Sequence, residues 1–347
     1  MEILVTGGNG FVGHHLVEAL LDRGERVRVL ALPEEDASGL ERRGVAIHRG
    51  DICRPETLAA PMRGADAVIH LAAMMHVWRP LRDYLAVNVG GTEHVCKAAL
   101  AAGVRRLVYM SSSSVYGMAS HGPVDEQSPL SPFDDPYPKS KAEGDELVQR
   151  MIAEEGLPAV IIRPDQIFGP GDRLHFAQIA DRLRAGRAII VGRGDNAIPL
   201  VYVTDIVQGL LLALDHENAL GQAFNITNDT PLTQEGFMRA IADEIGAKPP
   251  RVHIPYRALY AAAYAAERLA SARRGSHRPP VTRLGVAFLG RDVRFRIDKA
   301  RTELGYAPRV TLREGVRLTA SWLAAEGARL RIVSPTGPAP GQPTPGA

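Results

Sequence analysis

Cysteine is scarce in this sequence, and long hydrophobic runs are absent. Cys53 and Cys96 are the two cysteines, and they form neither a Cys-x-x-Cys pair nor a cluster with histidines. This excludes a disulfide framework and a structural zinc site. No apolar run reaches the ~18 residues that a membrane span needs, and the first residues do not have the pattern of a secretory signal. We therefore predict a cytoplasmic protein.

An excess of charge of either sign is also absent. The 347 residues include 41 basic and 39 acidic ones, so the formal net charge is only +2. This balance argues against nucleic acid or an anionic membrane as an obligate partner. The motifs of zinc proteases, P-loop NTPases and serine hydrolases are missing, and no metal site is predicted. With 45% hydrophobic and 23% charged residues, the chain is expected to be globular and to act on a small molecule.

The first half of the chain alternates short apolar runs with helical patterns, as in βαβ units of a parallel sheet. The expected strands are Glu2–Thr6, Arg26–Ala31, Val45–His48, Ala65–Leu71, Arg106–Ser111 and Pro158–Arg163. Helices are expected at Phe11–Arg23, Leu81–Ala102, Pro138–Glu155, Phe176–Ala185, Asp205–Leu214 and Thr233–Ile245, and a further strand at Leu200–Val203. This order predicts an α/β fold with a doubly wound parallel sheet (Rossmann fold) and ligands at the carboxyl ends of its strands.

A glycine-rich loop, Thr6–Gly13, lies between the first strand and the first helix. There Gly7 permits a tight turn, Gly10 lets the backbone approach a pyrophosphate, and Gly13 lets the helix pack closely. A glycine-rich surface turn is the alternative interpretation. The context favours a dinucleotide site, with these predicted contacts: Gly7, Gly10, Phe11, Val12, Gly13, Asp51, Ile52, Leu71, Ala72, Ala73, Asn88 and Pro164.

Two features of this predicted site leave alternatives open. Asp51 could face an adenine ring, although an aspartate at a strand end can equally be a solvated cap. The second strand ends in Ala31-Leu32-Pro33, which supplies neither the acidic residue typical of NAD sites nor the arginine typical of NADP sites. NAD is favoured because no arginine stands at this turn, and NADP stays open.

The glycine loop also suggests how the chain is divided. We expect residues 1–165 to form the NAD(P)-binding domain, to which a strand and a helix near residues 198–227 return. Residues 166–332 are expected to form mainly a smaller substrate-binding lobe. Residues 333–347 have almost no apolar side chains, which predicts a disordered tail.

Tyr137 and Lys141 are four residues apart, so a helix would place both on one face. A neighbouring ammonium favours a phenolate and makes the tyrosine a better base near neutral pH. Ser112 follows the fifth expected strand and can donate a hydrogen bond to a substrate oxygen. The four serines at 111–114 could also make ordinary turn hydrogen bonds, and we choose Ser112 as catalytic and Ser113 as a substrate contact.

Together these motifs resemble the extended short-chain dehydrogenases/reductases, the NAD-dependent epimerase/dehydratase superfamily. The resemblance covers residues 1–330 and includes the Thr6–Gly13 loop, Asn88–Thr92, the serine run that ends at Gly117, and the Tyr137/Lys141 pair. It implies that Ser112 is catalytic, Tyr137 is the acid/base, and Lys141 holds the nicotinamide ribose and lowers the pKa of the tyrosine. Asn88 would support that region, although a helix-start asparagine also has a structural explanation. The resemblance further suggests a homodimer through the helices expected at Leu81–Ala102 and Pro138–Glu155.

The segment Arg163–Asp172 resembles the entry to the substrate lobe in this superfamily, with Gln166 and Ile167 as predicted substrate contacts. Nucleotide-sugar members usually have an asparagine where Gln166 stands and an arginine where Ile198 stands. A sugar diphosphate needs cations to compensate its charge. The departures weaken a nucleotide-sugar function, although Arg173, Arg182 or Arg193 could substitute.

Other segments are more similar to the 3β-hydroxysteroid dehydrogenase branch, namely Ile167–Asp172, Pro279–Arg283 and Lys299–Tyr306. Within the expected second lobe, apolar and aromatic residues recur at helical spacing and form a stripe on one face of a helix: Tyr256, Leu259, Tyr260, Ala263, Tyr264 and Leu269. It could pack in the core, cover an apolar substrate or make a peripheral contact with a membrane surface.

The sequence thus predicts an NAD(P)-dependent oxidoreductase that interconverts a secondary alcohol and a ketone. The favoured substrate is a 3β-hydroxysteroid, a sterol or a similar apolar 3-hydroxy compound. One alternative is a nucleotide-sugar epimerase or dehydratase, such as a UDP-glucose 4-epimerase-like enzyme, that recycles NAD in each turnover. A dinucleotide-sensing protein without chemistry is the other alternative, against which the complete Ser112, Tyr137 and Lys141 set argues.

Overall fold

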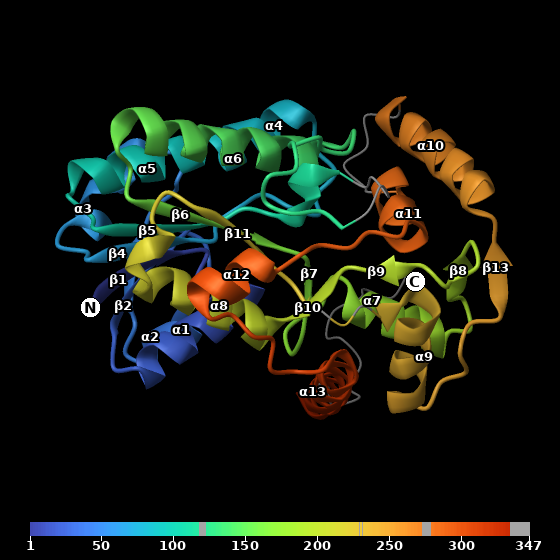
Figure 1. Cartoon of the computed structure of the whole chain (residues 1–347). Coiled ribbons are helices and arrows are strands. Elements are labelled where there is room, and N and C mark those ends of the chain that lie inside the picture. The colour runs from blue at the N-terminus through green and yellow to red at the C-terminus, as the bar shows by residue number, and fades with distance from the viewer. Residues whose placement is uncertain (118–122, 229, 231, 273–278, 334–347) are drawn as a thin grey trace, which may run out of the picture.

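A seven-stranded parallel sheet forms the centre of the molecule, which a computed structural model describes over residues 1–117, 123–228, 230, 232–272 and 279–333 (Figure 1). Its strands, in spatial order, are β11 (Ala223–Ile226), β6 (Ala159–Pro164), β5 (Arg106–Met110), β4 (Ala67–His70), β1 (Glu2–Thr6), β2 (Arg26–Ala31) and β3 (Ala46–Arg49). All six ladders between them are parallel. The predicted doubly wound fold is confirmed.

Helices cover both faces of this sheet, because successive strand residues point to opposite sides and both sides are apolar. Ile3 and Val160 pack with α1 (Phe11–Asp22) and α8 (Val203–Asp215) on one face. Leu4 and Ile161 pack with α5 (Thr92–Ala101) and α6 (Pro136–Glu155) on the other. The short helices α2 (Ser38–Glu41) and α3 (Ala59–Met62) lie in the connections that flank β3.

The helix expected at Leu81–Ala102 is confirmed to Ala101, with a π-helical segment in its middle. It consists of α4 (Leu81–Leu85), a π-helical segment at Ala86–Gly91, and α5. Gly91 is required in this segment, because a Cβ there would lie 2.7 Å from the Ile52 side chain. Helix α6 begins at Pro136, two residues before its expected start, because the Asp135 carboxylate caps the backbone N–H of Tyr137 at 3.1 Å.

The rest of the chain forms a second lobe, to the right in Figure 1. Its strands pair two by two: β7 (Gln166–Phe168) with β10 (Leu200–Tyr202), β8 (Ile189–Val191) with β13 (Val252–Ile254), and β9 (Ala197–Ile198) with β12 (Leu232–Thr233). Its helices are α7 (Phe176–Arg184), α9 (Gln234–Glu244), α10 (Tyr256–Ala272), α11 (Arg283–Gly290) and α13 (Leu312–Val333). Helix α12 (Asp298–Leu304) instead packs against β11 and α8 beside the large sheet. The predicted disordered tail begins at Val333, which is the last residue of α13. The remaining residues of the tail, 334–347, lie outside the described part of the chain.

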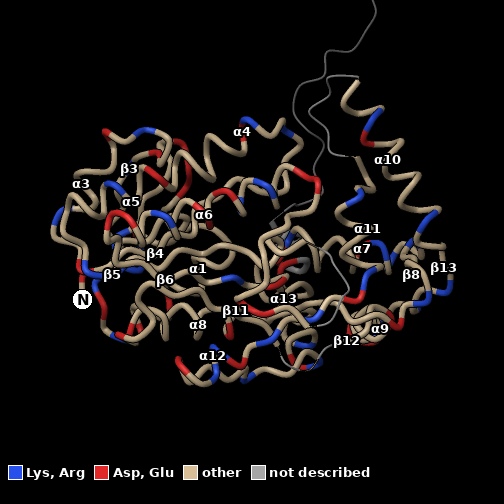
Figure 2. The backbone as a smooth tube through the Cα atoms, turned by 45° about the horizontal axis from the view of Figure 1, so that its top comes forward, with Lys and Arg blue, Asp and Glu red and all other residues tan. Residues whose placement is uncertain are grey.

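Along the backbone, basic and acidic residues are interspersed rather than gathered by sign (Figure 2). Within the described ranges no helix has both the length and the apolar character that a membrane crossing requires.

Candidate active site

The glycine loop has the geometry of a phosphate cradle. Gly7 has a φ of +70°, and a Cβ there would lie 2.8 Å from the backbone N of Ala72. Gly10 donates its N–H to the Gly7 carbonyl at 3.1 Å, and a Cβ on Gly13 would lie 2.2 Å from that same carbonyl oxygen. No side chain caps α1, and its first turn carries no acidic residue. Free backbone N–H groups at this end of α1 therefore fit a pyrophosphate.

The other predicted cofactor contacts line the carboxyl ends of neighbouring strands. Phe11 opens α1, Val12 and Leu71 are buried, Ala72 and Ala73 are half-buried just after β4, Ile52 is buried after β3, and Pro164 ends β6. The Asp51 carboxylate accepts the backbone N–H of Cys53 at 2.8 Å. That bond is the local turn contact expected of a strand-end aspartate, and it leaves the role toward adenine a prediction.

The four serines after β5 have different surroundings. Ser111 donates to Asp145 at 2.5 Å, and the Ser113 hydroxyl faces Asp165. The Ser114 hydroxyl oxygen is buried without a hydrogen-bond partner in the described part of the chain. The Ser112 hydroxyl faces the phenol of Tyr137, and its oxygen accepts the backbone N–H of Ser114 at 3.2 Å. Geometry therefore brings Ser112, and not its neighbours, to the predicted acid/base.

The surroundings of Tyr137 correct one expectation from the sequence. Burial raises the pKa of Tyr137, and the nearby Ser112 hydroxyl lowers it without reversing that rise. The lowering of this pKa expected from the Lys141 ammonium is therefore not present. Lys141 is 3% exposed, and its Nζ donates to the Met110 carbonyl at 2.7 Å and to the Tyr109 hydroxyl at 3.2 Å. Burial lowers the pKa of Lys141 to about 8.

Asn88 fixes the first turn of α6 from the π-helical segment. Its side chain exchanges two hydrogen bonds with the backbone of Met74, at 2.7 and 3.0 Å, and donates to the Ser140 hydroxyl at 2.9 Å. Ser140 in turn donates to the Tyr137 carbonyl at 2.9 Å. Asn88 thus connects the loop after β4 with the backbone that carries Tyr137.

A second buried chain of hydrogen bonds, which the sequence pattern did not indicate, lies beneath this one. The His70 ring contacts the Thr6 hydroxyl at 2.6 Å and the Thr92 hydroxyl at 3.1 Å, and Thr92 donates to the Asn88 carbonyl at 2.8 Å. Burial lowers the pKa of His70 to about 3, so the imidazole is neutral. This chain ties β1 and β4 to the segment that holds Asn88.

Arg163 and Asp145 form a buried ion pair between β6 and α6. The guanidinium makes two hydrogen bonds with the carboxylate, at 2.7 and 2.9 Å, and a third with the Tyr116 hydroxyl at 2.6 Å. Both side chains are at most 3% exposed. The sequence identified Arg163 only as part of a motif, because its partner lies eighteen residues away along the chain.

Two histidines adjoin Tyr137 on the side of the second lobe. The ring of His76 stacks on Tyr137 with centroids 6.4 Å apart, and His175 meets His76 edge-on at 4.4 Å. His76 has a φ of +58°, the one positive value on a non-glycine residue in the described ranges. The Gln166 amide contacts the His175 ring at 2.7 Å, and Ile167 is half-buried beside Gln166 in β7.

Asp165 is a further residue of this region that the sequence did not single out. It follows β6 directly and is 5% exposed. The Ser113 and Thr227 hydroxyls face its carboxyl and lower its pKa, yet burial dominates and raises that pKa to about 7. The sequence feature that could have identified Asp165 is its position as an acidic residue immediately after a strand that is buried along its whole length.

The arginines proposed to replace the missing nucleotide-sugar cation do not converge on the site. Arg173 pairs with Glu326 at 2.7 Å, and Arg193 pairs with Asp195 at 2.8 Å. Arg182 donates to the Pro280 carbonyl at 3.2 Å. Ile198, at the usual arginine position, is buried in β9.

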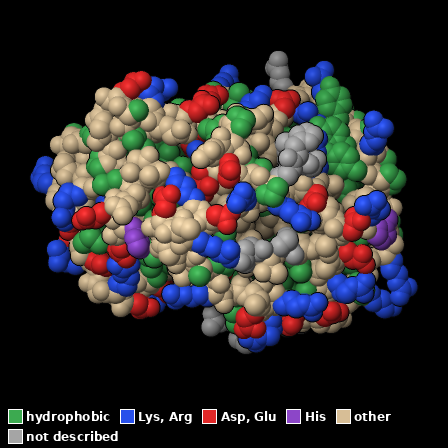
Figure 3. Space-filling model, viewed as in Figure 1, with side chains coloured by type: hydrophobic (Ala, Val, Ile, Leu, Met, Phe, Trp, Pro, Cys, Tyr) green, Lys and Arg blue, Asp and Glu red, His purple; other side chains and the backbone are tan. Residues whose placement is uncertain are grey.

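The helical stripe of α10 is divided between core and surface. Tyr256, Leu259, Tyr260 and Ala263 pack in a cluster with α11, whereas Tyr264 and Leu269 are 49% and 52% exposed. A green area at the upper right of Figure 3 lies over α10.

Helix α10 is also linked to the start of α6. Glu267 accepts two hydrogen bonds from Arg283, from the backbone N–H at 2.7 Å and from Nε at 2.6 Å. Arg283 lies 3.6 Å from Asp134, which pairs with Lys139 at 2.6 Å.

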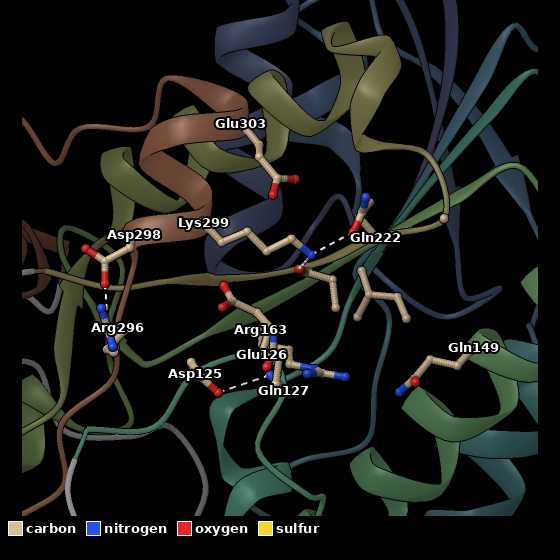
Figure 4. A pocket seen from close by; sticks show the side chains of 13 residues that line it. Asp125, Glu126, Gln127, Gln149, Arg163, Gln222, Arg296, Asp298, Lys299 and Glu303 are labelled. Atoms are coloured by element: carbon tan, nitrogen blue, oxygen red, sulfur yellow. Dashed lines mark hydrogen bonds and ion pairs between the residues drawn. The ribbon is translucent and has the colours of Figure 1, made fainter.

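A separate cavity of about 660 Å³ lies beside β11 (Figure 4). Its lining includes Lys299, which donates to Gln222 at 2.7 Å, and Arg296, which donates to Asp298 at 2.6 Å. None of the predicted site residues lines it, so it is not the candidate active site. In the described ranges, no group of three His, Cys, Asp or Glu residues could hold a metal ion.

A parallel doubly wound sheet with a glycine cradle defines the dinucleotide-dependent class of proteins. The chain belongs to the NAD dependent epimerase/dehydratase family, whose model matches residues 3–227. It is an NAD-dependent oxidoreductase of that family, as the predicted resemblance implied.

Three relatives illustrate the similarity. A 4-hydroxy-2-methyl-3-oxo-4-farnesyl-3,4-dihydroquinoline-1-oxide ketoreductase of Stigmatella aurantiaca is 35% identical over 91% of this chain and 95% of its own. A 3beta-hydroxysteroid-dehydrogenase/decarboxylase of Arabidopsis thaliana is 34% identical over 91% and 78%. The structure of the dTDP-glucose 4,6-dehydratase DesIV of Streptomyces venezuelae, solved with NAD bound, matches with a TM-score of 0.77 at 27% identity over 95% and 98%. NAD is therefore the cofactor of this site.

Proposed function

We propose that this protein interconverts a secondary alcohol and a ketone on an apolar 3-hydroxy compound, of which a 3β-hydroxysteroid or sterol is the favoured example. The approach of the Ser112 hydroxyl to the Tyr137 phenol is the observation that carries the proposal. Two hydroxyl groups so arranged can hold one substrate oxygen between them. NAD, when bound, accepts or returns the hydride at the carbon that bears this oxygen.

The chain's own residues supply the proton chemistry. Ser112 donates a hydrogen bond to the substrate oxygen, and Tyr137 takes the hydroxyl proton during oxidation or returns it during reduction. Lys141, one helical turn away on α6, would hold the nicotinamide ribose beside Tyr137. Since burial raises the pKa of Tyr137, alcohol oxidation should become faster as the pH rises.

The nucleotide-sugar alternative is less well supported. The carboxylate of Asp172 accepts the backbone N–H groups of Leu174, His175 and Phe176 at 2.9 to 3.1 Å, just before and at the start of α7. These groups therefore do not face an added anion. Gln166 is engaged with His175, and the candidate arginines pair elsewhere. The ketoreductase and steroid dehydrogenase relatives support an apolar substrate.

Several wider features remain predictions. The cytoplasmic location, the homodimer through α4, α5 and α6, and the division at residue 165 also stand as proposals.

The test is to incubate the protein with NAD and a panel of 3β-hydroxysteroids and to monitor NAD reduction by nicotinamide absorbance. We expect Tyr137→Phe to lower kcat by about 100-fold or more and Ser112→Ala to lower it by a similar order. Ser114→Ala is the matched control and should retain activity, because the Ser114 hydroxyl makes no hydrogen bond in the described chain. If no member of the panel is oxidised, the steroid proposal fails and nucleotide sugars become the next candidates.

A further inference from the structure

Ser112 lies at the junction between the end of β5 and a single 3₁₀ turn. The backbone N–H of Ser111 still donates to a carbonyl of β6 at 2.7 Å, whereas Ser113–Tyr116 forms the turn. The Ser112 hydroxyl accepts the backbone N–H of Ser114 at 3.2 Å and faces the phenol of Tyr137. The direction of this hydroxyl therefore depends on how the two ends of the segment are held.

The first end of the segment is held by α6. The Ser111 hydroxyl donates to the Asp145 carboxylate at 2.5 Å. Lys141, one turn earlier on the same helix, donates to the Met110 carbonyl at 2.7 Å. Helix α6 thus fixes β5 up to the residue that precedes Ser112.

The second end of the segment is held by β6. The Arg163 guanidinium donates to the Tyr116 hydroxyl at 2.6 Å, and this hydroxyl donates in turn to the Asn225 side chain on β11 at 2.8 Å. The next residue, Gly117, has a φ of +79°, and a Cβ there would lie 2.3 Å from the Ser131 carbonyl oxygen. The 3₁₀ turn therefore ends at a fixed place.

The side chains that hold the two ends are partners in one buried ion pair. Arg163 donates two hydrogen bonds to Asp145, at 2.7 and 2.9 Å, and both side chains are at most 3% exposed. Gln149 donates to the same carboxylate at 2.7 Å. Because burial removes the hydration of both charges, such a pair contributes little net stability compared with apolar side chains. Its directional hydrogen bonds instead define positions.

We infer that the buried Asp145–Arg163 pair positions Ser112 for the reaction. Asp145 fixes the residue before Ser112, and Arg163 fixes the turn after it. Since the two charged groups are bonded to each other, the two ends of the segment keep one fixed separation. Asp145 and Arg163 are positioning residues, and the inference rests on the proposed function for the catalytic role of Ser112.

The experiment removes the two hydroxyl groups through which the pair holds the segment. Substituting Asp145 or Arg163 would leave a buried charge uncompensated and destabilise the fold. Ser111→Ala and Tyr116→Phe leave the ion pair in place. Ser114→Ala is the matched control, because it removes a hydroxyl of the same segment that makes no hydrogen bond in the described part of the chain.

A double-mutant cycle separates positioning of Ser112 from general support of the fold. With NAD and the 3β-hydroxysteroid that the wild type oxidises fastest, Ser111→Ala and Tyr116→Phe should each lower kcat by about tenfold, because a displaced donor stabilises the transition state less well. The KM for NAD should stay within about twofold of the wild-type value. In a Ser112→Ala background the same substitutions should change kcat by less than about twofold, since the group being positioned is gone. Equal losses in the two backgrounds, or no greater loss than in Ser114→Ala, would overturn the inference.

Hydrogen–deuterium exchange tests the same arrangement without any reaction. The backbone N–H groups of Ser114 and Gly117 donate to the Ser112 hydroxyl and the Ser114 carbonyl at 3.2 and 3.1 Å, so both report on the turn. Their exchange should be at least about fivefold faster in Ser111→Ala and Tyr116→Phe, while the amides of β2 exchange as in the wild type. Unchanged exchange at the turn, or an equal increase in β2, would overturn the inference. If the turn responds as expected while the wild type oxidises no alcohol, the positioning of Ser112 stands and only the proposed reaction fails.

Discussion

A carboxyl group that is buried without a cation makes the fold sensitive to pH. The pKa of Asp165 is about 7 in the folded chain and 3.8 in its reference state, so the folded state holds the proton more tightly. Its destabilising effect is absent at low pH and grows as the pH rises from about 4 to about 7, to at most roughly 4 kcal/mol. We predict that Asp165→Asn raises the free energy of unfolding at about pH 8 and leaves it nearly unchanged at about pH 4. Urea unfolding at both pH values checks this, and a variant that loses stability with rising pH as the wild type does would contradict it.

Single residues differ in how far the sequence could identify them. Tyr137 and Lys141 were identifiable because their spacing on one helix is a local property. The preference for Ser112 over its neighbours came from the resemblance, and only the fold shows that Ser111 and Ser113 face other carboxyl groups. His76 was not identifiable, since its stacking on Tyr137 depends on the path of the loop after β4.

At the scale of elements, α10 depends on one side chain for its link to the start of α6. Glu267 is buried and accepts two hydrogen bonds from Arg283. We predict that Glu267→Gln lowers the free energy of unfolding by about 1–3 kcal/mol and speeds trypsin cleavage after Arg268 on the same helix. Glu314→Gln is the matched control, because its exposed pair with Arg317 should matter little. Equal urea midpoints and cleavage rates for the two variants would contradict the prediction.

Helices and strands were predictable where the local sequence pattern determines them. They were missed where contacts with distant parts of the chain determine the backbone conformation. Alternating apolar runs gave six strands of the sheet to within two residues, because both faces of a parallel sheet are buried. The π-helical segment at Ala86–Gly91 was not predictable, since it is held by contacts of Asn88 with Met74 and Ser140. Residues 198–227 could be assigned to the sheet only in general terms, and the pairing of β11 with β6 needed the structure.

At the scale of the whole molecule, cofactor binding should stabilise the fold, because a ligand that binds only the folded state adds its binding free energy to that of unfolding. NAD at about 100 times its Kd should add about 2.7 kcal/mol. A Cβ on Gly10 would lie 3.2 Å from the Gly7 carbonyl oxygen, a contact that the fold can absorb, whereas a Cβ on Gly39 would meet nothing within 4 Å. We predict that Gly10→Ala folds but loses most of the stabilisation by NAD, since its methyl group occupies the pyrophosphate cradle. Gly39→Ala, the matched control, should keep the stabilisation by NAD. Thermal unfolding with and without NAD checks this prediction. Equal stabilisation of the two variants would refute this placement of the cofactor.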